Sequence, residues 1–170
     1  INTTPLIGDQ ATEATVKQRL ETASILHFAT HGIVPNSDRD AESSWLALAD
    51  TDAGGEDGKL TLTEIFNSTL NAPLAVLSAC NSNSGEVTGE GGLGFARAFL
   101  KAGIPAGVGR LWPVPDQSTP TLNEAVYPGL LAGENYANAL RTSPLKGRSP
   151  SPYPRRLASF TGTCECDHPF

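Results

Sequence analysis

The sequence predicts one α/β domain built around a mostly parallel sheet. Two short hydrophobic runs, residues 25–29 and 74–80, have the length of strands buried on both faces. Segments with helical patterning lie between such runs, an alternation typical of parallel strands joined by right-handed crossovers. Active sites in these sheets lie beyond the carboxyl ends of the strands. The ends of the two runs are therefore the first places to search for a catalytic site.

Helical patterning is clearest in the first half of the chain. Residues 11–23 predict an amphipathic helix, in which Lys17 is expected to face water. Thr61 followed by Glu64 has the spacing of a capping box, so a short helix should begin there and run through Phe66.

The second half continues the alternation and then changes character. Residues 93–102 predict a helix, residues 106–112 a third strand, and Thr119 the cap of a further helix that Pro128 should end or kink. Residues 142–170 are rich in proline, and no regular structure is expected for them. The predicted division is therefore a domain over residues 1–141 and an atypical tail over 142–170.

Composition limits the possible functions. The 170 residues carry a formal net charge of −6, which argues against nucleic-acid binding because that needs a basic face. No hydrophobic run approaches the roughly 20 residues of a membrane-spanning helix. Three cysteines make no disulfide framework, so a reducing cytoplasm is the expected setting. The chain contains no methionine, and we expect it to be a piece of a longer protein.

The reactive residue types stand where the two hydrophobic runs end. His31 follows the first run and Cys80 ends the second, so adjacent parallel strands would bring an imidazole base beside a thiol nucleophile. The N–H groups of Gly32 and Cys80 are candidate donors to an oxyanion. The alternative is an inert core cysteine beside a structural histidine. His27 lies inside its strand and is interpreted as structural.

Two blocks, His27–Gly32 (HFATHG) and Leu77–Cys80 (LSAC), resemble the signature blocks of the CHAT domain, a caspase-like peptidase domain found next to tetratricopeptide repeats. Segments 46–65, 89–103 and 111–119 also resemble the family pattern. The resemblance runs from about residue 6 to residue 141. It implies a caspase-like three-layer α/β sandwich, with His31 as base and Cys80 as nucleophile. Relative to that pattern, the first strand and helix are missing from this chain.

Two other motifs are interpreted as lacking a function. Residues 89–94 match G-x-G-x-x-G, but they are separated from the preceding strand, and nearby glutamates would repel a pyrophosphate, so no cofactor is expected. Cys164 and Cys166 with His168 could bind zinc, but a fourth ligand is not evident and no metal is expected.

Asp116 and Trp112 are the candidate residues of a substrate pocket. Both follow the third predicted strand, at the end of the sheet where His31 and Cys80 emerge. A carboxylate there would favour Lys or Arg before the scissile bond, and Trp112 could form a wall of the pocket. Alternatively, Asp116 is a turn residue ahead of the helix and Trp112 is half-buried in the core.

The function that these features predict is a cysteine endopeptidase that cleaves a partner protein. One alternative is a non-catalytic interaction or signalling module attached to repeats. Another is acyl transfer or glutaminase-type chemistry by the same His31 and Cys80 pair. The intact pair favours an enzyme, since a scaffold need not keep both residues.

Overall fold

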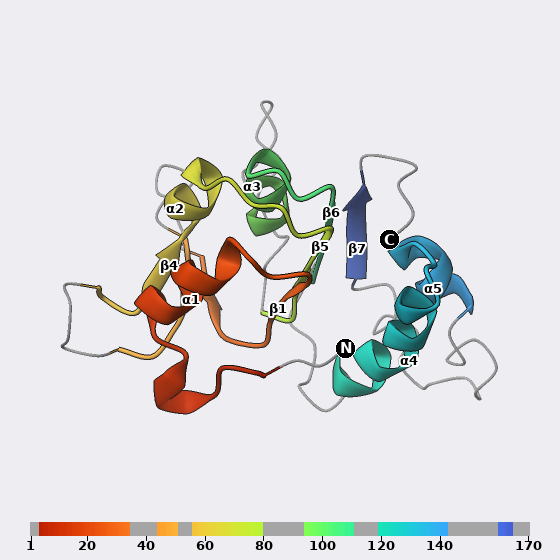
Figure 1. Ribbon diagram of the computed structural model, residues 1–170, viewed down its shortest axis with the longest axis horizontal. Helices are drawn as coiled ribbons and strands as arrows, with labels where there is room; N and C mark the ends of the chain where they lie inside the picture. Colours follow the sequence, from red (N-terminus) through yellow and green to blue (C-terminus); the bar gives the residue numbers. More distant parts are fainter. Residues whose placement is uncertain are drawn as a thin grey trace.

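The hydrophobic runs of the sequence form the strands of a four-stranded sheet (Figure 1). This computed structural model describes residues 4–34, 44–50, 56–79, 94–110, 119–142 and 160–164. The strands lie in the order β1 (Leu26–Phe28), β5 (Leu74–Leu77), β6 (Ala106–Arg110) and β7 (Phe160–Cys164). The first three are parallel and β7 is antiparallel to β6. The expectation of a mixed α/β domain with a mostly parallel sheet is confirmed.

A second, three-stranded antiparallel sheet follows β1 directly. It contains β2 (Gly32–Ile33), β3 (Trp45–Ala47) and β4 (Lys59–Thr61), with β3 in the centre. The carboxyl end of β1 therefore continues into this small sheet after a link of three residues.

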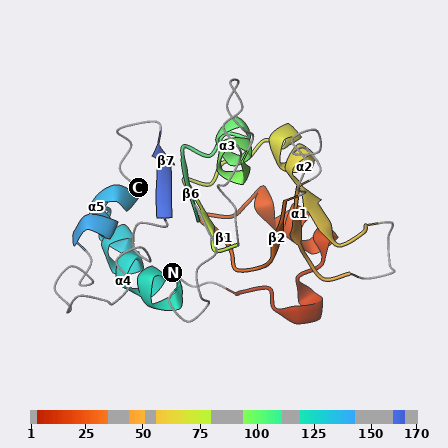
Figure 2. The ribbon, with the colours of Figure 1, turned by 180° about the vertical axis from the view of Figure 1, so that it is seen from behind.

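Helices flank the four-stranded sheet on both sides (Figures 1 and 2). They are η1 (Gly8–Gln10), α1 (Glu13–Leu20), α2 (Leu62–Asn67), α3 (Phe95–Lys101), α4 (Thr119–Leu131) and α5 (Tyr136–Thr142). The predicted capping box begins α2: the Glu64 N–H donates to the Thr61 hydroxyl oxygen, and the Thr61 N–H donates to the Glu64 carboxylate. This cap satisfies backbone groups that the first turn would otherwise leave unpaired.

Two hydrophobic clusters lie on the opposite faces of the four-stranded sheet. One joins α1, α2 and α3 to the sheet through Ala75 and Leu77 of β5. The other joins α4 and α5 to it through Leu74 and Val76. All four residues of β5 are buried, which explains why its sequence is a continuous hydrophobic run instead of an alternating one.

The first helix differs from its prediction in its length and in the exposure of Lys17. Glu13, Val16 and Leu20 are its buried residues, and Lys17 is only partly exposed instead of facing water. A glutamate can be buried here because a lysine one turn later pairs with it.

Two features of the second half also differ from expectation. Pro128 does not end α4, which continues to Leu131; the exposed position of Pro128 lets water reach the backbone group that a proline leaves unpaired. Residues 160–164, within the segment expected to have no regular structure, form β7 and pair along the whole length of β6. A five-residue backbone ladder supplies hydrogen bonds that a local composition argument cannot foresee.

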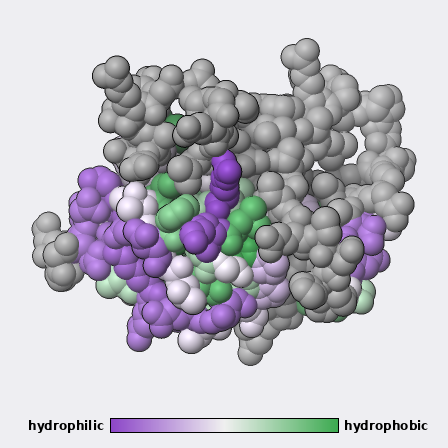
Figure 3. Space-filling view, turned by 90° about the horizontal axis from the view of Figure 1, so that it is seen from above, coloured by the Kyte–Doolittle hydropathy of each residue, from purple (hydrophilic) through white to green (hydrophobic). Residues whose placement is uncertain are grey.

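Hydrophobic side chains are visible on part of the described surface (Figure 3). Seen from above, hydrophobic residues lie among hydrophilic ones (Figure 3). The large hydrophobic side chains exposed among the described residues are Ile7 before η1, Phe66 of α2 and Leu131 of α4. None of the helices in the described segments is long and apolar enough to cross a membrane.

Candidate active site

The predicted base lies just beyond the carboxyl end of a parallel strand pair. In the register of β1 and β5, Phe28 lies opposite Leu77. The Ser78 N–H donates to the Phe28 carbonyl at 2.8 Å, so the pairing continues one residue past β5. Paired residues in this register differ by 49 in residue number, and His31 and Cys80 also differ by 49.

The backbone around His31 is held by the antiparallel sheet. The Ala47 N–H donates to the His31 carbonyl at 2.9 Å, and the Thr30 hydroxyl donates to the Ala47 carbonyl. Gly32 opens β2 opposite Leu46 and is half-buried. His31 itself is exposed, so a backbone held by hydrogen bonds presents this imidazole to solvent.

Three of the predicted site residues, Cys80, Trp112 and Asp116, lie outside the described residues. The described segment 56–79 ends at Ala79, which is fully buried and precedes Cys80 directly. The structure therefore places His31 and Gly32 at one end of the sheet, and the roles of all five residues remain predictions.

A polar cluster that the sequence analysis did not identify lies next to this strand end. His27 of β1 contacts Ser78 through Nε2, at 3.0 Å from Oγ, and Tyr127 of α4 through Nδ1, at 2.6 Å from the phenol oxygen. Burial lowers the pKa of His27 and raises the pKa of Tyr127 to about 12. His27 and Ser78 stand inside the two signature blocks, but no local pattern could add Tyr127, which is 100 residues from His27.

A second cluster joins α1, α2 and the segment before β4. The Lys17 ammonium lies 2.6 Å from Glu13, 2.9 Å from Glu56 and 2.7 Å from Glu64. Three carboxylates at such close quarters could hold a cation. Because the ammonium already bonds to all three, we interpret the group as an ion-pair network and not as a metal site.

The pKa directions agree with this interpretation. Burial lowers the pKa of Lys17, but the hydrogen bonds that its ammonium donates to the three carboxylates outweigh burial, and the net pKa is raised. Burial raises the pKa of Glu13, which is 2% exposed. Burial also raises that of Glu64, but hydrogen bonds from Lys17 and Thr61 turn the net shift downward.

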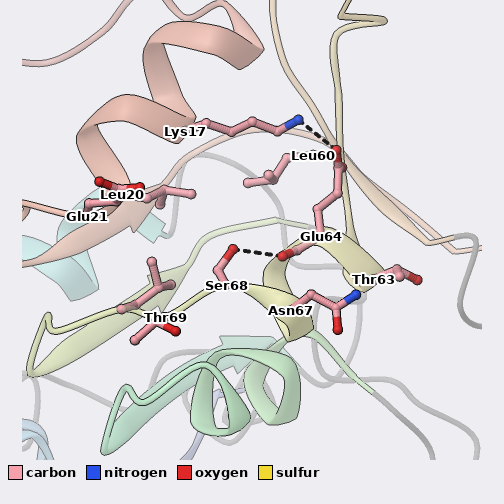
Figure 4. A pocket seen from close by; sticks show the side chains of 10 residues that line it. Lys17, Leu20, Glu21, Leu60, Thr63, Glu64, Asn67, Ser68 and Thr69 are labelled. Carbon is pink, nitrogen blue, oxygen red and sulfur yellow. Dashed lines mark hydrogen bonds and ion pairs between the residues drawn. The ribbon is translucent and has the colours of Figure 1, made fainter.

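A pocket of about 610 Å³ lies between α1 and α2 (Figure 4). Lys17 and Leu20 line it from α1, and Glu64 and Asn67 line it from α2. Neither His31 nor Gly32 is among its lining residues, so the pocket is separate from the predicted active site.

The remaining sequence motifs fall largely outside the described residues. Gly94 of the glycine-rich motif is the N-cap of α3, and residues 89–93 lie outside. Cys164 ends β7, whereas Cys166 and His168 lie outside.

Comparison with known proteins identifies the family of this chain. The CHAT domain family profile matches residues 2–162. The chain is 29% identical over 165 residues to human tetratricopeptide repeat protein 28 and 30% identical over 158 residues to the mouse protein of the same name. These alignments cover 80% and 76% of this chain but 7% and 6% of the relatives, so the chain spans a small part of their length. The chain belongs to the CHAT domain family.

Proposed function

We propose that the chain is a caspase-like cysteine endopeptidase domain that cleaves a partner protein with His31 as base and Cys80 as nucleophile. The observation that supports this most strongly is the register of β1 and β5. Aligned residues differ by 49 in number, as His31 and Cys80 do, and the pairing extends to Ser78. Parallel strands in this register lead both residues toward one edge of the sheet.

The proposed reaction needs few groups. His31 takes the proton of the Cys80 thiol as sulfur attacks the scissile carbonyl carbon. The N–H groups of Gly32 and Cys80 donate to the resulting oxyanion. The C–N bond then breaks, His31 returns the proton to the leaving amine, and water hydrolyses the thioester to restore the thiol.

Selective alkylation tests the proposed pair without a known substrate. With limiting iodoacetamide, we expect Cys80 of the folded protein to react faster than Cys164 and Cys166, because a nearby imidazole favours the thiolate. His31→Ala should slow the Cys80 reaction. The labelled sites and their rates are read by peptide mass spectrometry.

The matched control is His168→Ala, which removes a histidine that the proposal does not use. It should leave the Cys80 rate at the wild-type value. An unchanged Cys80 rate in His31→Ala would contradict the pairing. When a cleaved peptide has been found, Cys80→Ala and His31→Ala should each lower its turnover by several orders of magnitude while the melting temperature stays close to that of the wild type.

Substrate preference is proposed to depend on Asp116, with Trp112 forming a wall of the pocket. A carboxylate in a partly desolvated pocket attracts a cationic side chain more strongly than one in open water. A library of short peptides should therefore show preference for Lys or Arg before the scissile bond, and Asp116→Ala should remove it. A basic preference that survives this substitution would assign Asp116 to a turn.

The second candidate function is a non-catalytic interaction module. This alternative is favoured by the two relatives, which are both named as tetratricopeptide repeat proteins. The chain covers only a small part of each of them. In that case Cys80→Ala would retain all partner binding, and no peptide of the library would be cut by the wild-type protein.

The proposed location of the protein is the cytoplasm, because of the chemistry of the Cys80 thiol. A nucleophilic thiol must stay reduced, and a reducing cytoplasm supplies that condition. We propose that tetratricopeptide repeats in the full-length protein bring the substrate to this domain.

A further inference from the structure

His27 faces the opposite side of β1 from its two neighbours. Leu26 and Phe28 pack into the cluster formed with α1, α2 and α3. His27 lies on the α4 side, opposite Val76, which belongs to the second cluster. His27 is itself exposed, and it places two hydrogen-bonding nitrogens at the edge of this hydrophobic cluster, within reach of side chains from other elements.

Both ring nitrogens have partners from other elements. Nε2 lies 3.0 Å from the Ser78 hydroxyl, just past the end of β5, and Nδ1 lies 2.6 Å from the Tyr127 hydroxyl of α4. The His27 and Tyr127 rings also stack, with centroids 5.9 Å apart and planes inclined by 29°. The imidazole therefore connects two strands and a helix at one point.

Ser78 is held at this point in two ways. Its N–H donates to the Phe28 carbonyl at 2.8 Å, and its side chain contacts His27. Phe28 is three residues before His31, and Ser78 is two residues before Cys80. A shift of β1 against β5 here would therefore change the separation of the two proposed catalytic residues.

We propose that His27, together with Tyr127, is a positioning residue that fixes the carboxyl end of β5 at Ser78 against the strand that leads to His31. This inference rests on the proposed cysteine peptidase function and adds to it. His27 takes no part in proton transfer to substrate; it limits the movement of the strand ends. Such limits matter because a displacement of about 1 Å can lower a rate by about 100-fold.

The test uses iodoacetamide alkylation of Cys80 as a function of pH, at a temperature where every variant is folded by circular dichroism. His27→Phe, which removes both nitrogen contacts, should lower the neutral-pH rate by about 10- to 100-fold and move the rate profile to higher pH. His27→Gln places an amide near the Nε2 position and should recover most of the rate. Tyr127→Phe keeps the ring and removes the hydroxyl, and should give an intermediate loss.

Tyr136→Phe is the matched control. Tyr136 belongs to the same cluster, but its hydroxyl is buried without a hydrogen-bond partner among the described residues. Its loss should leave the alkylation profile unchanged. A merely structural role for His27 would lower the melting temperature and leave the profile in place.

The outcomes separate this inference from the proposed function. If His31→Ala slows alkylation while Tyr127→Phe and His27→Phe keep the wild-type profile, the positioning role is wrong and the peptidase proposal stands. If His31→Ala also keeps the wild-type profile, both are wrong. If His27→Phe does not fold, the alkylation profile of Tyr127→Phe tests the positioning role: an intermediate loss of rate supports it, and a wild-type profile contradicts it.

Discussion

His27 owes its properties to the face of the strand on which it lies. Leu26 and Phe28 are buried on one side of β1, and the alternation of side chains directs His27 to the other, against Tyr127. There burial lowers its pKa. His31, four residues later, is exposed at the start of the small sheet. Both histidines are exposed, but His27 lies within β1 and contacts Ser78 and Tyr127 through its ring, whereas His31 lies between β1 and β2.

This difference predicts how stability depends on pH. Because the pKa of His27 is lower in the folded state, the unfolded chain binds more protons as the pH falls below about 6.5, and folding loses free energy. The stabilisation is complete above the unfolded pKa and is lost as pH falls toward the folded one. Tyr127, with its pKa raised to about 12, stays neutral throughout.

We therefore expect the melting temperature of the wild type to fall more steeply than that of His27→Gln between about pH 8 and about pH 5. Differential scanning fluorimetry on both proteins in matched buffers measures the two slopes. Parallel slopes would show that the folded state does not lower the proton affinity of His27.

Among the elements, α1 and α2 illustrate packing that depends on a charge. Lys17 of α1 contacts Glu13 of the same helix and Glu64 of α2, and Glu56 completes the group. Glu13 is buried, so its carboxylate depends on this ammonium. The same ammonium holds α2 beside α1.

Lys17→Met should therefore destabilise the fold. Removing one partner of a buried pair costs about 3–5 kcal/mol, and because the Lys17 side chain is 33% exposed we expect about 2–3 kcal/mol. The free energy of unfolding is measured by urea titration. The loss should shrink at low pH, where the carboxylates become protonated and cease to repel one another.

The control for this prediction is Lys59→Met. Lys59 pairs at 2.9 Å with Asp57, and both side chains are largely exposed, so little stability should be lost. Equal losses for the two variants would mean that burial of Glu13 has no part in the effect.

At the scale of the whole molecule, β5 couples the two hydrophobic clusters. Its side chains alternate between them, with Ala75 and Leu77 on one face and Leu74 and Val76 on the other. Because both clusters share this strand, disruption of one cluster should also destabilise the other. We therefore expect the domain to unfold in one cooperative transition.

Substitutions on either face should shift that single transition. Ile65→Ala in the first cluster and Leu130→Ala in the second should each cost about 2–5 kcal/mol. Leu131→Ala, at the neighbouring but 60% exposed position, should cost far less. Calorimetry of the three variants that resolves two separate transitions would show that the clusters unfold independently.

Much of the architecture was determined by local sequence. Hydrophobic runs predicted β1 and β5, and the Thr61–Glu64 spacing predicted the cap of α2, because strand burial and helix capping depend on residues a few positions apart. The third predicted strand, residues 106–112, corresponds to β6. The two signature blocks indicated the CHAT family, which the match over residues 2–162 confirms. The sequence also singled out His31, whose place at the end of β1 follows directly from the length of that strand.

Other features depend on contacts between distant segments. The pairing of β7 with β6, the meeting of Tyr127 with His27, and the burial of Glu13 against Lys17 and Glu64 each need the folded chain. No local pattern encodes them, because each is decided by which surfaces the sheet and helices bring together. The register of β1 and β5 is also a tertiary feature, and it supports pairing His31 with Cys80 more strongly than their spacing in the sequence does.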